Sequence, residues 1–100
     1  MTTLHISLDD GFSEQSVAIL VNGRLTCNKP DVSTDLRTAH AAALDVELEG
    51  TLAHVTVLVE PDGLQASTDL DCNATPYLGI DINRQGSIDF RPTQTMPRYV

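Results

Sequence analysis

Oxygen-bearing side chains recur at alternate positions between residues 81 and 89, and they form the most specific chemical pattern in this sequence. The run reads Asp81-x-Asn83-x-Gln85-Gly86-x-Ile88-Asp89. Carboxylate and amide oxygens are the ligands that Ca²⁺ prefers, and a glycine among them allows the chain to turn sharply around an ion. The residue types and their spacing therefore make a cation site a hypothesis to test.

This run resembles the first nine positions of an EF-hand calcium loop, including the glycine and the aliphatic residue that follows it. The resemblance ends at the twelfth position, where Pro92 replaces the bidentate glutamate, and strand-like residues replace the flanking helices. A plain β-hairpin is the preferred interpretation, and calcium binding is the alternative. We accordingly assign no metal ligand, no catalytic residue and no cofactor.

The predicted hairpin has an electrostatic cost of its own. With Gly86 at the left-handed position of a bulged turn, Asp81 lies directly opposite Asp89. Like charges in that relation destabilise a strand pair. A nearby arginine, Arg84 or Arg91, could offset the repulsion, as could solvent or a cation.

The other polar residues show weaker patterns. Asp69-x-Asp71-x-Asn73 also alternates oxygen ligands, but it lacks a glycine, and turn-forming, solvated acids explain it more simply. The three histidines, His5, His40 and His54, are too scattered to predict a metal site. Non-ligand roles are therefore preferred for all of them.

The two cysteines, Cys27 and Cys72, do not form a CxxC pair. Free thiols are the preferred interpretation, and a bridge between two sheets is the alternative. The sequence also has no GxSxG motif, and neither cysteine has a local catalytic signature. A stand-alone enzyme is therefore unsupported.

Composition limits the class of protein further. A chain of 100 residues predicts one domain, spanning 1–100. The net charge of −8 repels phosphate groups, so neither nucleic acid nor an anionic membrane is an expected partner. No apolar run is long enough to span a membrane and no signal peptide is recognisable, so the expected location is cytoplasmic.

The candidate side chains described above must be positioned by short segments of alternating apolar and polar residues, which are separated by turn residues. The pattern predicts an all-β fold, an antiparallel sandwich of seven to eight strands that is immunoglobulin-like or transthyretin-like in outline. The clearest strands are 3–8, 16–21, 44–48, 53–59, 64–70, 77–82 and 87–91. Residues 33–43 combine helical spacing with four alanines, so they form either a short crossover helix or an extended loop.

Asn22-Gly23 predicts a type I′ hairpin turn, because both central positions of that turn need positive φ. The hairpin pairs Leu20 with Leu25 and Ala18 with Cys27. Apolar residues then occupy both faces of strand 16–21. Such a strand is either covered on both faces or packs on another chain.

Two further hairpins are expected in the middle of the chain. A loop formed by 49–52 pairs Val46 with Val55, and it sets Glu47 opposite His54. Pro61-Asp62-Gly63 predicts the turn that leads into strand 64–70. The three strands would form a meander.

These observations favour a non-enzymatic protein-interaction or assembly module. The doubly apolar strand points to a protein partner, in the simplest case a second copy in a homodimer. The alternative is a small cation- or ligand-binding accessory domain that uses the hairpin between Asp81 and Asp89.

Overall fold

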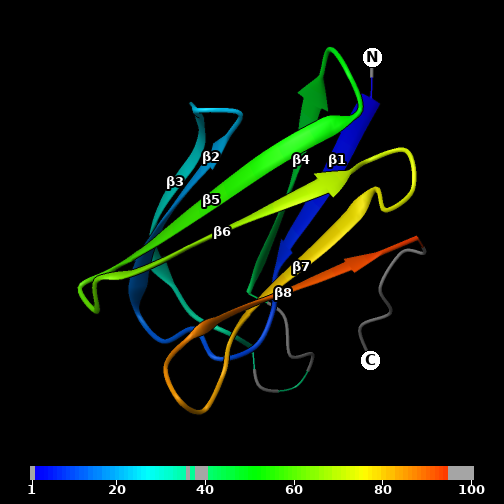
Figure 1. The fold of residues 1–100 in the computed structure, drawn as a ribbon. Coiled ribbons are helices and arrows are strands. Elements are labelled where there is room, and N and C mark those ends of the chain that lie inside the picture. The colour runs from blue at the N-terminus through cyan, green and yellow to red at the C-terminus, as the bar shows by residue number, and fades with distance from the viewer. Residues whose placement is uncertain (1, 36, 38–40, 95–100) are drawn as a thin grey trace.

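The computed structural model describes residues 2–35, 37 and 41–94, which form eight β-strands in two sheets (Figure 1). This part of the chain contains no helix. The strands are β1 (Thr2–Leu8), β2 (Gln15–Val21), β3 (Arg24–Val32), β4 (Ala42–Leu48), β5 (Leu52–Glu60), β6 (Leu64–Asp71), β7 (Tyr77–Ile82) and β8 (Ile88–Thr93). The predicted all-β class and its strand count are confirmed.

Each sheet has four strands, in the orders β4-β1-β7-β8 and β3-β2-β5-β6. Neighbouring strands are antiparallel except β1 and β7, which run parallel. The expectation of a wholly antiparallel sandwich is therefore wrong at this one pair. A parallel pair needs a crossover connection, and here the chain crosses through the second sheet before it returns as β7.

The core lies between the two sheets and is mainly aliphatic. It draws Leu4, Ile6 and Leu8 from β1 and alternate valines from β5, all almost completely buried. The inner face of β2 adds Val17, Ile19 and Val21. Burying such side chains stabilises the fold by about 1.5–3 kcal/mol each, so this apolar layer is its main source of stability.

The hairpin at Asn22-Gly23 forms with positive φ at both turn residues, 53° and 80°. Leu20 pairs with Leu25 as predicted, but a bulge after this pair sets Cys27 opposite Ile19 instead of Ala18. The bulge shifts the register by one residue. The hydroxyl of Thr26 donates to the carbonyl oxygen of Ile19 at 3.0 Å, which supplies a partner within the irregular stretch.

The predicted hairpin between the strands of 44–48 and 53–59 is wrong. β4 pairs with β1 in one sheet, and β5 pairs with β2 and β6 in the other. Val46 and Val55, expected to be ladder partners, are both buried but enter the core from opposite sheets. Alternation indicates which face of a strand is apolar, and that face is buried equally well in either sheet.

The two later hairpins are confirmed. Pro61-Asp62-Gly63 turns the chain from β5 into β6. Gly86 has a φ of 80°, and Asp81 lies directly opposite Asp89 in the β7–β8 pair. β8 runs on through Pro92, which is tolerated because β8 is an edge strand.

The crossover helix considered for residues 33–43 is not found where the structure describes that segment. Residues 33–35, 37 and 41 are non-helical, and Ala42 already begins β4. Residues 36 and 38–40, which include His40, lie outside the described residues. Thr34 holds the start of this connection by accepting from and donating to the β1–β2 loop.

Candidate functional site

Arg91 joins two aspartates at the end of the sheet β4-β1-β7-β8. Its Nε donates to Asp81 at 2.6 Å, and its Nη2 donates to Asp9 at 2.6 Å and to the second oxygen of Asp81 at 3.2 Å. The hydrogen bond to Asp81, and then the charges of both aspartates, raise the pKa of Arg91 against the opposing effect of burial. The two aspartates therefore favour the charged form of the guanidinium.

We refer to Ser7, Asp9, Asp81 and Arg91 together as the arginine clasp. The side chain of Asp9 is only 4% exposed, and the hydroxyl of Ser7 donates to it at 3.1 Å. The clasp needs Gly79, because a Cβ there would lie 3.0 Å from both Arg91 and Asp9. It ties the end of β1 to the β7–β8 hairpin.

Arg91 of the clasp offsets the repulsion between Asp81 and Asp89, which lie opposite each other. Both oxygens of Asp81 bond to Arg91, and one of them also accepts the backbone N–H of Asp10 at 2.9 Å. Asp89 accepts from the side-chain amide of Asn83 at 3.2 Å. The two carboxylates that suggested a cation site are thus engaged within the chain.

Asn83, another oxygen-bearing residue of the run, is engaged within the turn of this hairpin. The side-chain oxygen of Asn83 accepts the backbone N–H groups of Gln85 and Ser87, each at 3.0 Å. Across the residues that the structure describes, no three or more His, Cys, Asp or Glu side chains cluster in an arrangement suited to a metal ion. Calcium binding by this hairpin stays an untested alternative.

The outer face of the other sheet, β3-β2-β5-β6, carries an apolar stripe that we define as Ala18, Leu20, Leu25 and Leu58. Ala18 pairs with Leu58, and Leu20 pairs with Leu25. Leu25 is 56% exposed, whereas the other three are half-buried between their neighbours. The doubly apolar character predicted for β2 is therefore real, with one face in the core and the other on the surface.

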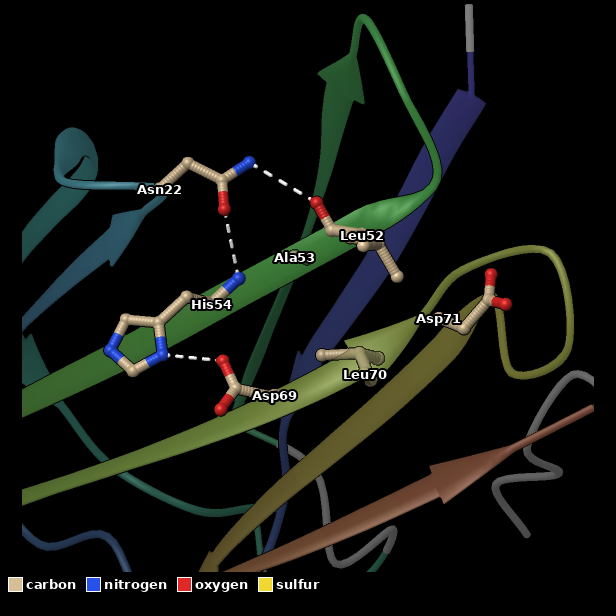
Figure 2. A pocket seen from close by; sticks show the side chains of 7 residues that line it. All are labelled: Asn22, Leu52, Ala53, His54, Asp69, Leu70 and Asp71. Atoms are coloured by element: carbon tan, nitrogen blue, oxygen red, sulfur yellow. Dashed lines mark hydrogen bonds and ion pairs between the residues drawn. The ribbon is translucent and has the colours of Figure 1, made fainter.

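An open hollow of about 430 Å³ lies at one end of this outer face (Figure 2). Figure 2 shows its lining residues, which are Asn22, Leu52, Ala53, His54, Asp69, Leu70 and Asp71. His54 Nδ1 lies 2.6 Å from an Asp69 oxygen. The Asn22 side chain accepts the backbone N–H of His54 at 2.9 Å and donates to the carbonyl of Leu52 at 3.3 Å.

The carboxylate of Asp69 orients the imidazole, so the ring presents Nε2 at a set angle as a polar contact group. Leu52 supplies the apolar part of the hollow and is 72% exposed. The nearest hydroxyls on the same face, Thr56 and Ser67, bond to each other at 3.0 Å. The arrangement offers one oriented imidazole beside an exposed leucine, which suits recognition at a surface.

The partner of His54 was mispredicted, because the β4–β5 hairpin does not form and Glu47 lies in the other sheet. A correct signal was present in the turn at 61–63, whose register carries His54 opposite Asp69. His5 lies in the other sheet, where Nδ1 contacts Asp45 at 2.6 Å. The histidines within the described residues are therefore not brought together.

Cys27 and Cys72 are both free. They belong to opposite ends of the same sheet, since Cys27 lies on edge strand β3 and Cys72 directly follows edge strand β6. Three strand spacings amount to roughly 14 Å, beyond the reach of a disulfide. The bridge between sheets considered from the sequence is therefore wrong.

The two thiols should differ in reactivity. Burial, and then the charge of Asp71, raise the pKa of Cys72, whereas Cys27 is half-buried. A water-soluble aromatic disulfide should therefore modify Cys27 in the native protein and Cys72 only after unfolding, because the thiolate must form and be reached. Absorbance of the released thiol measures both phases, and two equally fast thiols would contradict the expectation.

The described residues include no helix with the length and hydrophobicity of a membrane span. Comparison of the chain with protein-family models, with curated proteins and with solved structures gives no match in any of the three.

Proposed function

We propose that this protein is a non-enzymatic interaction module that self-associates as a homodimer through the apolar stripe. The observation that carries the proposal is the position of the stripe on the outer face of two central strands, β2 and β5, with Leu25 exposed beside them. Contiguous exposed apolar surface is a feature of protein-interaction sites. An isologous contact would use this one patch on both copies.

The absence of charge on the stripe supports a second copy as its occupant. Each chain carries a net charge of −8, so two copies repel each other over most of their surface. The stripe has no charged member, and two stripes can meet without placing like charges in contact. Added salt screens the remaining repulsion, so self-association should strengthen as the salt concentration rises.

For the fold, we propose the transthyretin-like outline over the immunoglobulin-like one. In immunoglobulin constant domains the first, second, fourth and fifth strands share one sheet. Here β1 and β4 lie in one sheet, and β2 and β5 lie in the other. This difference in strand order supports the choice.

Sedimentation velocity at increasing protein concentration, in low and high salt, tests the dimer. We expect Leu25→Glu to weaken dimerisation by at least about tenfold, because it removes the burial of a leucine and adds a charge at the contact. Ala43→Glu is the matched control. It adds the same charge at an exposed position of β4, on the other sheet.

The wild-type protein and the Ala43→Glu variant should dimerise alike, and more strongly at high salt. A wild-type protein that stays monomeric at every concentration would overturn the proposal. Equal weakening by Ala43→Glu and Leu25→Glu would also overturn it, because the stripe would then have no special role.

A further inference from the structure

The four edge strands differ in how well they are protected against pairing with another chain. β3 carries two register shifts, and it also contains Pro30 and an Asp31 whose backbone has positive φ. β8 contains Pro92. β6 contacts β8 across the sandwich. Bulges, prolines and covering segments are the usual means by which edge strands are blocked.

β4 has none of these protections in the part of the chain that the structure describes. Its seven residues contain no proline, and its pairing with β1 is uninterrupted from Leu48 to Ala42. Among the described residues, its backbone makes hydrogen bonds to β1 and to no other segment. The outward-pointing N–H and C=O groups of β4 are therefore available to another strand.

A groove runs beside this edge, between β4 and the β2–β3 hairpin. It has a volume of about 270 Å³ and a mixed lining of apolar, polar and charged residues, which are Val21, Asn22, Arg24, Thr26, Val46, Glu47, Leu48, Glu49 and Gly50. A strand added to β4 would point every second side chain inward, toward this groove. Apolar side chains at those positions would lie over the edges of Val46 and Leu48, which are 8% and 6% exposed.

The outward positions of β4 have the opposite character. Asp45 and Glu47 are exposed and alternate with the inward residues, and Asp45 also contacts His5 of the neighbouring β1 at 2.6 Å. Across a strand pair, opposite charges stabilise and like charges destabilise. A second copy of β4 would place negatively charged side chains opposite each other. A strand with lysine or arginine at alternate positions would instead place a positive charge opposite both Asp45 and Glu47.

We propose that the β4 edge binds an extended segment of a basic partner protein as an additional strand of the sheet. The segment alternates apolar residues, which face the groove, with basic residues, which face Asp45 and Glu47. Main-chain hydrogen bonds supply affinity and the alternating side chains supply specificity. This site is separate from the apolar stripe and does not depend on dimerisation.

The probe is a blocked synthetic peptide in which lysine and valine alternate over the length of β4. Calorimetry measures its affinity, and amide hydrogen exchange locates it on the labelled protein. We expect binding together with slowed exchange at the outward amides of β4. A peptide with glutamate in place of lysine and a lysine peptide with N-methylated backbone amides are the controls, and neither should bind.

Glu47→Lys should weaken lysine-peptide binding about fivefold to tenfold, since it converts an attractive cross-strand pair into a repulsive one. Glu60→Lys is the matched control, because it makes the identical substitution at an exposed position of β5, in the other sheet. It should leave binding unchanged. Circular dichroism verifies that both variants are folded.

Four outcomes would overturn this site. They are no binding of the lysine peptide, equal binding of the N-methylated peptide, protection on a strand other than β4, and equal losses in the two variants. The last outcome would show attraction to the net negative charge alone.

Discussion

Gly11→Ala is expected to lower the free energy of unfolding by about 3–5 kcal/mol, because a Cβ at Gly11 would make the closest contact found at any glycine of this chain. Gly11 has a φ of 88°, a region that alanine rarely adopts. A Cβ there would lie 2.0 Å from the carbonyl oxygen of Ile82. That oxygen belongs to the backbone, so no side-chain rotation relieves the clash.

Hydrogen bonds beside Gly11 explain why the loop between β1 and β2 cannot move away from β7. The backbone carbonyl of the neighbouring Asp10 accepts the N–H of Ile82 at 2.9 Å, and the backbone N–H of Asp10 donates to the Asp81 carboxylate. Separating the loop from β7 would break both bonds. Thermal unfolding should show a decrease in Tm of more than about 12 °C, given roughly 4–8 °C per kcal/mol for a domain of this size.

Gly86→Ala is the matched control for backbone strain. Gly86 has a φ of 80°, but a Cβ there would meet no atom within 4 Å. Its replacement should cost about 1–2 kcal/mol, from the left-handed conformation alone. If the two variants unfold at the same temperature, the close approach of Gly11 to Ile82 is not tight in solution.

Arg91→Met is expected to destabilise the fold by about 2–4 kcal/mol. The substitution keeps an unbranched apolar stem but removes the guanidinium that bonds to Asp81 and to the buried Asp9. Breaking a buried ion pair costs more than the pair contributes, because the remaining charge stays out of water. The value lies below that of a fully buried pair because the Arg91 side chain is about half exposed.

Chemical denaturation measures this loss, and two further variants identify its cause. Arg37→Met removes a guanidinium that pairs with Asp35 at 3.3 Å on the open surface, and it should change stability by less than about 1 kcal/mol. Adding Asp9→Asn to Arg91→Met should restore part of the stability, since the stranded charge is then gone. Equal effects of Arg91→Met and Arg37→Met would show that the clasp contributes little.

Much of the local structure could be predicted because turn chemistry is local. Asn22-Gly23 and Gly86 need positive φ, so each indicates its hairpin without information from the rest of the chain. The β7–β8 register followed from Gly86 and correctly placed Asp81 opposite Asp89. The apolar outer face of β2 was likewise visible as an unbroken apolar run.

Tertiary structure alone decided which strands became neighbours. Alternation identifies the buried face of β4 and of β5, but both faces meet the same core, so the pattern does not choose between the two sheets. That choice set Asp69, and not Glu47, beside His54. The sequence by itself determined the strands, the turns at 22–23, 61–63 and 83–86, and the apolar character of both faces of β2, because these depend on neighbouring residues.

The contacts of the arginine clasp could not be predicted from local sequence patterns either, because they join residues far apart in the chain. Arg91 and Asp9 are 82 residues apart, and they meet only because β1 runs parallel to β7. No local pattern encodes a parallel pair whose crossover passes through the other sheet. The sheet assignment, the clasp and the open edge of β4 were therefore decided by the packing of the whole chain, where burial of a shared core selects among pairings that are locally equivalent.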